Sequence, residues 1–191
     1  MTYKEYLMSD DWRRKRDKRL LIDQRCSICG RPFDLEVHHM TYKTFPNENT
    51  TDLITVCRNC HSRIESLKKE SWYDSFGIVN KLLVDQFVKE YATKDYSAGG
   101  DVDFCNLEIV KRYLFPYMKE HGVNLDYLSG TNRVIERFRD KRYKVILNYI
   151  EHGYPKEIVK QRVRFSHSMI DKVYKEPEKT RKTLNYESEE N

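Results

Sequence analysis

The hydrophobic and polar residues divide the chain into three parts, and the first is a basic helix near the N-terminus. Ser9 is a good helix N-cap, and Asp10 and Asp11 after it suit the positive end of the helix dipole. The residues expected to face inward are Trp12, Leu20 and Leu21. The basic residues expected to face outward are Arg13, Arg14, Arg16, Lys18 and Arg19.

The second part carries two short β-type patterns followed by a helical one. Residues 35–39 alternate as a half-buried strand does, and residues 53–56 are rich in β-branched side chains. Turn-forming residues occupy positions 45–51 between them. A helical pattern runs from Arg58 to about Lys69, so the predicted order is strand, loop, strand, helix.

The third part, residues 72–175, has apolar residues at helical spacing. The stretch 97–101 is the best linker candidate because it combines small residues with two glycines. The sequence therefore predicts a mostly helical α+β protein. Its expected divisions are a module at 1–74, a helical region at 75–175 and a loose polar tail at 176–191.

Residues 153–175 resemble a helix-turn-helix. Pro155 suits the start of one helix, and Ser166 suits the N-cap of a second. The residues that the second helix would present to a major groove are His167, Ser168, Asp171 and Lys172. Lys160 and Arg164 stand where this motif usually has a small residue and a turn glycine, so an ordinary helical hairpin stays open as the alternative.

Composition narrows the function classes only modestly. The 191 residues are 39% hydrophobic and 34% charged, with a net charge of +5, which favours an anionic partner. No apolar run approaches the roughly 18 residues of a membrane span, and the N-terminus lacks the apolar region of a signal peptide. We therefore expect no membrane partner. Four of the five cysteines have metal-type spacing, which favours a reducing cytoplasm over a disulfide framework.

The chemistry concentrates in residues 26–65. Two Cys-x-x-Cys pairs, Cys26/Cys29 and Cys57/Cys60, suit one structural zinc ion. The histidines that they leave free are His38, His39 and His61. Adjacent strand residues point to opposite faces, so one of the paired histidines can bind a metal while the other activates water. A non-catalytic zinc ribbon explains the cysteines but has no need of these histidines.

These residues resemble the HNH endonuclease family, whose fold is the ββα-metal fold. The matching motifs are Cys26-x-x-Cys29, Val37-His38-His39, Asp52-Leu53-Ile54 and Val56-Cys57-Arg58-Asn59-Cys60-His61, and Tyr6-Leu7-x-Ser9-x-x-Trp12 resembles phage-borne members. The resemblance implies that His39 is the general base and that His38 and His61 bind a divalent ion. Mg²⁺ or Mn²⁺ is the expected ion, and other divalent ions are alternatives. The middle position of the motif falls on Asp52, with Asn47 as a rival.

The resemblance also implies hydrolysis of double-stranded DNA to 5′-phosphate and 3′-hydroxyl ends. The residues expected to contact the DNA are Arg13, Arg14, Arg16, Arg58, His167, Ser168 and Lys172. Homing, a phage-encoded role and a DNA-packaging accessory nuclease with packaging partners are alternative settings, in a bacterial or phage-infected cytoplasm. The target sequence, the choice between nicking and double-strand cleavage and the oligomeric state are not specified by the sequence.

Overall fold

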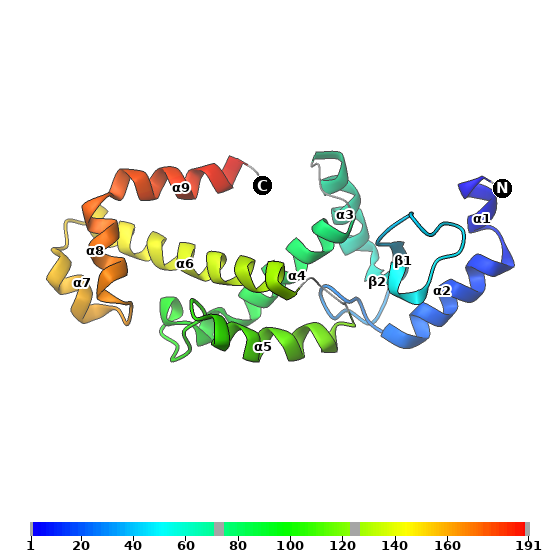
Figure 1. The fold of residues 1–191 in the computed structure, drawn as a ribbon, viewed down its shortest axis with the longest axis horizontal. Coiled ribbons are helices and arrows are strands. Elements are labelled where there is room, and N and C mark those ends of the chain that lie inside the picture. The colour runs from blue at the N-terminus through cyan, green and yellow to red at the C-terminus, as the bar shows by residue number, and fades with distance from the viewer. Residues whose placement is uncertain (1, 71–74, 123–126, 190–191) are drawn as a thin grey trace. The chain divides into compact units, whose positions relative to one another are not determined.

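The computed structural model describes residues 2–70, 75–122 and 127–189, which are mostly helical and contain one two-stranded antiparallel sheet (Figure 1). The predicted α+β class is confirmed. By contacts the chain forms two compact units, Met1–Gln86 with Leu114–Gly130 and Phe87–Tyr113 with Thr131–Asn191. The predicted boundary near residue 74 concerns independent folding and stays a prediction.

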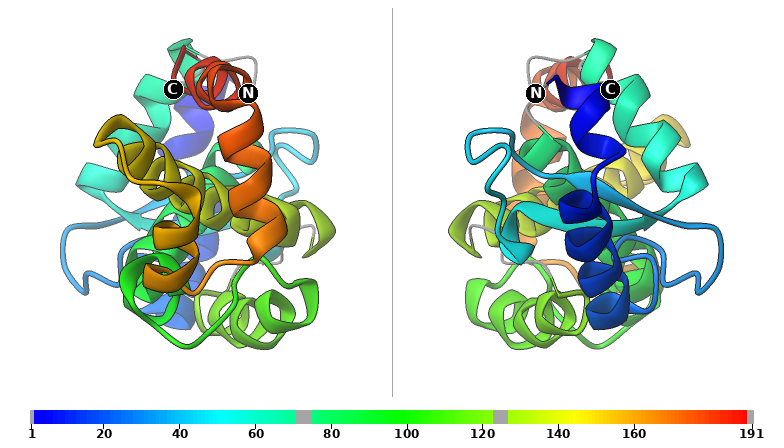
Figure 2. Two further views of the ribbon diagram at one scale, coloured as in Figure 1. Left: turned by 90° about the vertical axis from the view of Figure 1, so that its left-hand side faces the viewer. Right: turned by 90° about the vertical axis from the view of Figure 1, so that its right-hand side faces the viewer.

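Two capped helices open the first unit. The hydroxyl of Thr2 caps α1 (Tyr3–Leu7), and that of Ser9 caps α2 (Asp10–Asp23) by accepting from the backbone N–H of Trp12 at 3.1 Å. Helix α2 contacts both strands of the sheet, and Figure 2 shows it in dark blue across them. The small apolar cluster here consists of Tyr6, Trp12 and Leu53, joined by Val37 and Phe45.

The orientation predicted for the C-terminal half of α2 is wrong for two residues. Leu21 is 74% exposed, whereas Arg19 is only 6% exposed. The Arg19 guanidinium donates to Asp23 at 2.7 Å and to the carbonyl oxygens of Thr50 at 2.9 Å and Gly122 at 3.3 Å. A buried charge is tolerated when it is paired and hydrogen-bonded. Arg19 therefore takes the inward position that hydrophobicity alone assigned to a leucine.

The predicted strand, loop, strand and helix are present in that order. Strand β1 (Leu35–His39) pairs antiparallel with β2 (Leu53–Cys57), so that Leu35 lies opposite Cys57 and His39 opposite Leu53. A short 3-10 helix, η1 (Thr50–Asp52), precedes β2. Helix α3 (Arg58–Glu70) follows β2 directly and contacts both strands.

The longer helices that follow are α4 (Ser75–Tyr91), α5 (Leu107–Glu120) and α6 (Tyr127–Glu151). Two 3-10 turns, η2 (Ala92–Lys94) and η3 (Tyr96–Ala98), connect α4 to the loop before α5. In the second unit the Phe104 ring stacks on Phe138 at 4.6 Å and meets Phe87 edge-on at 5.9 Å. All three rings are fully buried.

The stretch 97–101 is a structured turn, so the linker prediction is wrong. The carboxylate of Asp95, which is fully buried, accepts from Arg142 at 2.7 Å. The backbone N–H of Gly100 donates to the carbonyl of Asp95 at 2.8 Å. A Cβ at Gly100 would lie 2.1 Å from the carbonyl carbon of Lys94, so only glycine fits this close approach.

Three helices complete the second unit: α7 (Lys156–Arg162), α8 (His167–Lys175) and α9 (Pro177–Glu189). Ser166 caps α8 as predicted, accepting from the N–H of Met169 at 3.3 Å. One apolar cluster joins α6 to these helices through Ile146, Val159, Ile170, Val173 and Leu184, with further members around them.

Helix α9 differs from the loose tail predicted after residue 175. Its Thr180 and Leu184 side chains are buried, at 7% and 8% exposure. The tail looks polar because these inward positions are few, but they dock on residues that come from other helices. No helix within the described ranges is long and apolar enough to cross a membrane.

We expect Ile170→Ala to lower the free energy of unfolding by about 2–5 kcal/mol, because it leaves a cavity in the apolar cluster where Ile170 is fully buried. Lys175→Ala, on the exposed side of the same helix, should change it by less than about 0.5 kcal/mol. Urea unfolding followed by circular dichroism measures both. Equal effects would contradict this packing.

Candidate active site and zinc centre

Four cysteines meet where the strands join α3. Cys26 and Cys29 lie in the loop before β1, Cys57 ends β2, and Cys60 is in the first turn of α3. Their sulfur atoms all lie within 4.8 Å of one another, with Cys29 Sγ and Cys57 Sγ 3.7 Å apart. The N–H of Gly30 donates to the carbonyl of Cys26 at 2.8 Å, which closes the first Cys-x-x-Cys turn. Four converging thiols are the donor set of a structural zinc ion.

The crowding of these thiols shifts their pKa values in opposite directions. A hydrogen bond from Cys60 lowers the pKa of Cys26 to about 4, against the effect of burial. The same hydrogen bond and then burial raise the pKa of Cys60, and burial raises that of Cys29. Four thiolates this close repel one another unless a cation neutralises them, so the cluster fits zinc.

A second cluster combines His38 from β1 with His61 and Glu65 from α3. The ligand atoms of these residues lie within 4.8 Å of one another. The two imidazole rings are 5.0 Å apart, and His38 Nδ1 lies 3.6 Å from a Glu65 oxygen. Glu65 follows His61 by four residues, so both project from one face of α3. The structure thus brings the predicted ligands together and adds a carboxylate.

The surroundings of this cluster suit a divalent cation. His38 is 3% exposed, and its Nε2 is buried without a hydrogen-bond partner among the described residues. Burial, followed by the charges of His61, Lys68 and His39, lowers the pKa of His38 to about 3, so the ring is neutral. Nδ1 of His61 lies 2.5 Å from Glu36, which orients that ring as carboxylates commonly orient metal-binding histidines.

His39 is 2% exposed and held on three sides. Its ring stacks between Trp12 at 4.8 Å and Tyr42 at 5.0 Å, and its Nε2 lies 3.0 Å from a Glu48 oxygen. Nδ1 faces the hydroxyl of Tyr3 at 3.4 Å. Burial lowers the pKa of His39, and the hydrogen bond with Glu48 only partly opposes this. The ring is therefore a neutral proton acceptor.

Glu48 fixes the tautomer of His39. It is 5% exposed and also accepts from the Tyr6 hydroxyl at 2.5 Å and from Lys15 Nζ at 3.1 Å. Burial raises the pKa of Glu48, but these hydrogen bonds outweigh it and leave the pKa below its ordinary value. An ionised Glu48 accepts from Nε2–H of His39, so Nδ1 carries the free lone pair.

The two rivals for the middle motif position differ in their surroundings. A carboxylate oxygen of Asp52 accepts from the Thr44 hydroxyl at 2.8 Å and from the backbone N–H of Asn49 at 2.9 Å. Asn47 is exposed, and its backbone N–H donates to the carbonyl of Thr44 at 2.6 Å. The side chain that turns inward from this part of the loop is that of its neighbour, Glu48.

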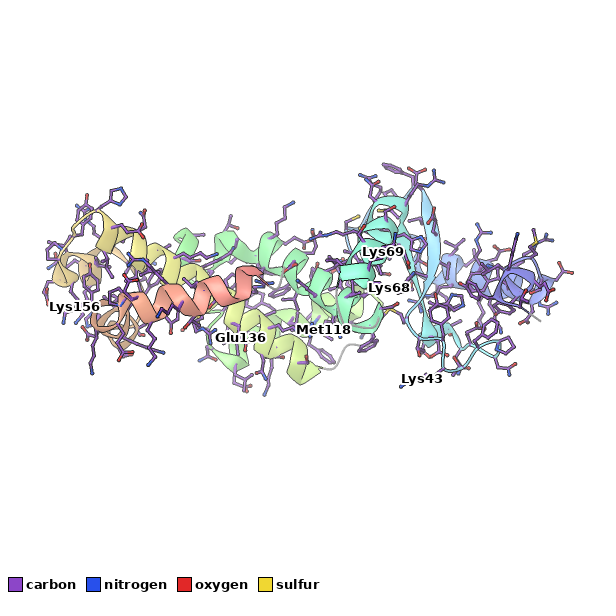
Figure 3. The ribbon with its side chains drawn as sticks, turned by 90° about the horizontal axis from the view of Figure 1, so that it is seen from above. Lys43, Lys68, Lys69, Met118, Glu136 and Lys156 are labelled. Atoms are coloured by element: carbon purple, nitrogen blue, oxygen red, sulfur yellow. The ribbon has the colours of Figure 1, made fainter. Side chains whose placement is uncertain are left out.

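The arginines expected to contact DNA are exposed but paired with nearby carboxylates. The side-chain exposures are 66% for Arg13, 75% for Arg14, 46% for Arg16 and 77% for Arg58. Exposed pairs of this kind contribute only about 0–1 kcal/mol. A phosphate could therefore replace each carboxylate at little cost. Lys68 and Lys69, near the end of α3, and Lys43, on the loop after β1, add charge to the same module (Figure 3).

On α8, the residues expected to contact DNA are exposed. They are His167, Ser168 and Lys172. Lys172 Nζ donates to the Tyr143 hydroxyl at 3.3 Å. Asp171 is paired instead, with Lys160 at 2.7 Å and Lys156 at 3.1 Å. The unusual lysine at position 160 thus makes a contact between the two helices of the hairpin.

Sequence reasoning missed three carboxylates of this site. Glu65 carries a usable signal, because it follows His61 by one helical turn. Glu36 is two residues before His38 on β1, so the two side chains lie on the same face of the strand. The contact of Glu36 with His61 depends on how α3 packs against the sheet, and the sequence pattern does not give that packing. Glu48 lies in an irregular loop with no periodicity, so no local pattern predicts its contact with His39.

Residues 26–67 match the family model described as HNH endonuclease. No curated protein and no solved structure matches the chain. The match spans both cysteine pairs and all three histidines, and the segment is an HNH module with two zinc-knuckle pairs. This supports a nuclease of the HNH family, for which DNA is the implied substrate.

We expect purified protein to hold about one zinc ion per chain, and Cys57→Ser to lose it and to unfold, because one of four clustered ligands is gone. Cys105→Ser is the matched control, since Cys105 lies outside the cluster. Elemental analysis and circular dichroism give the readouts. Folded wild-type protein without zinc would refute the assignment.

Proposed function

We propose that the protein is a metal-dependent endonuclease that hydrolyses DNA phosphodiester bonds. The observation that carries this proposal is the state of His39. Its Nε2 is bound to buried Glu48, which leaves Nδ1 as the proton acceptor. The next residue along the strand, His38, belongs to the cluster with His61 and Glu65. The base and one member of the metal-binding set are thus adjacent residues of β1.

In the proposed reaction, His39 accepts the proton of the water that attacks phosphorus. The bond between phosphorus and the 3′ oxygen then breaks, and the departing oxygen takes a proton from solvent water, leaving 5′-phosphate and 3′-hydroxyl ends. The imidazolium that forms is stabilised by the Glu48 carboxylate at 3.0 Å. Trp12 and Tyr42 hold the ring plane on its two faces. Positioning of this kind avoids reorganisation during the reaction.

His38, His61 and Glu65 would hold the divalent cation. Two imidazole nitrogens and one carboxylate oxygen leave positions open for phosphate, and they suit Mg²⁺ or Mn²⁺ among several ions. When bound, the cation would supply Lewis-acid stabilisation of the charge on the phosphate and on the departing oxygen. Asp52 would pin the loop between the strands through Thr44 and Asn49.

Two regions would hold the DNA. Arg13, Arg14, Arg16 and Arg58 on the HNH module would contact phosphates, and the hairpin of α7 and α8 would present His167, Ser168 and Lys172 to a major groove. Two features of this hairpin support the helix-turn-helix interpretation. The second helix is capped, and the side chains of Val159, Ile170 and Val173 are buried. Phage, homing and packaging roles, packaging partners and a cytoplasmic location stay predictions from the sequence.

We expect His39→Ala to lower the plasmid-cleavage rate by roughly 10²–10⁴-fold, because a positioned general base acts in the transition state. Zinc content and DNA affinity should stay near wild type. The readout is supercoiled plasmid incubated with Mg²⁺ or Mn²⁺. His152→Ala is the matched control, since His152 is exposed and its Nδ1 is hydrogen-bonded to the backbone oxygen of Asn148. Wild-type cleavage by His39→Ala would sink the mechanism.

We expect Lys172→Ala to weaken DNA binding and to lower the slope of log affinity against log salt by about one, as loss of one phosphate contact does. Lys179→Ala, a 77% exposed lysine on α9 paired with Glu176, should leave the slope unchanged. Fluorescence anisotropy at several salt concentrations measures both. If neither variant changes the slope, the hairpin of α7 and α8 is not the DNA-reading element.

A further inference from the structure

The proposed base has no direct route to water. His39 is 2% exposed, its two ring faces are covered by Trp12 and Tyr42, and Nε2 is held by Glu48. The group at the remaining nitrogen, Nδ1, is the hydroxyl of Tyr3 at 3.4 Å. Tyr3 itself is 42% exposed. The phenol therefore connects the buried imidazole with the solvent side of the module.

The position of Tyr3 is built into the fold. It is the first residue of α1, which Thr2 caps through a reciprocal pair of hydrogen bonds with Glu5. One turn later, fully buried Tyr6 anchors the helix by donating to Glu48 at 2.5 Å. The Tyr3 ring also packs on Tyr42 and Phe45, each at 5.8 Å. The same carboxylate therefore positions both the base and the helix that carries the phenol.

We propose that the Tyr3 hydroxyl is a catalytic residue that passes the proton of the attacking water to His39. This inference rests on the proposed function. Tyr3 donates its own proton to Nδ1 of His39 while its oxygen accepts a proton from water, so the phenol is unchanged at the end of the step. The water oxygen bonds to phosphorus as the bond to the 3′ oxygen breaks. His39 becomes an imidazolium beside Glu48.

Three features support the relay over direct contact between His39 and water. The tautomer that Glu48 imposes makes Nδ1 an acceptor, which is what a phenol needs in order to donate. Hydrogen bonds of catalytic groups are often long without substrate and shorten in the reacting complex, so 3.4 Å is compatible with transfer. Tyr3 is 42% exposed and His39 is 2% exposed, so Tyr3 lies between the buried ring and the surface of the module.

The electrostatic surroundings keep the phenol protonated. Burial, the Tyr42 hydroxyl and the carboxylates of Glu48 and Glu65 raise the pKa of Tyr3 above its ordinary value. Tyr3 is therefore a hydrogen-bond donor at any working pH.

The test uses single-turnover cleavage of a DNA substrate by the zinc-loaded full chain with Mg²⁺. Tyr3→Phe keeps the ring packing but removes the hydroxyl, and we expect the rate at saturating protein to fall on the order of 10²-fold. The protein concentration at half-maximal rate should stay near wild type. Tyr113→Phe is the matched control, because Tyr113 is a partly exposed tyrosine of the other unit that lies outside the residues assigned to the site and to DNA binding.

Rates in mixtures of H₂O and D₂O give a readout that a packing role would not change. Wild type should give a bowed plot of rate against deuterium fraction, because two protons move together, and Tyr3→Phe should give a straight one. A wild-type rate or a bowed plot for Tyr3→Phe overturns the relay. Faster cleavage by Tyr3→Ala than by wild type would also overturn the relay, because it would mean that Tyr3 blocks the access of water to His39. In each of these cases, loss of cleavage in His39→Ala would still support the proposed nuclease function, so that only the relay through Tyr3 would be rejected.

Discussion

The convergence of Cys26, Cys29, Cys57 and Cys60 is the constraint on which the rest of the HNH module depends. It ties the loop before β1, the end of β2 and the first turn of α3 to one point. The apolar cluster of this part is small, with Tyr6, Trp12 and Leu53 as its buried members. A bound metal ion can supply folding free energy that so small a core cannot. Because the cysteines set where α3 starts, they also set where His61 and Glu65 face His38.

Strand β1 divides the site between its two faces. His38 turns toward α3, where His61 and Glu65 complete a set suited to a cation, and His39 turns toward Trp12 and Tyr42. Each side has its own carboxylate support, Glu36 on His61 and Glu48 on His39. A one-residue slip of the strand would exchange these surroundings, which is why the register set by the sheet and the cysteines matters for chemistry.

The sequence predicted the parts of the site that follow from spacing, and it missed those that depend on tertiary contacts. Two Cys-x-x-Cys pairs and a His-His dipeptide on a strand are local patterns, as is the Ser166 cap of α8. Glu48 comes from an irregular loop, and its contact with His39 exists only because α1 and α2 pack against that loop through Tyr6 and Lys15. Likewise, Arg19 is buried because three acceptors meet it, and α9 forms because Leu184 docks on residues of other helices.

The central claim is that the protein has two metal sites, a structural zinc site at the four cysteines and a site for the divalent cation of cleavage at His38, His61 and Glu65. One experiment distinguishes the two sites. Zinc content and the rate of plasmid cleavage are measured on the same sample after mild chelation and again after addition of Mg²⁺ or Mn²⁺. Thiolate ligands hold zinc tightly, whereas two imidazoles and a carboxylate exchange their ion readily. Cleavage should therefore vanish while about one zinc per chain is retained, and the added ion should restore it. Cleavage that persists without added ion, or that disappears only when zinc is lost, would contradict the claim.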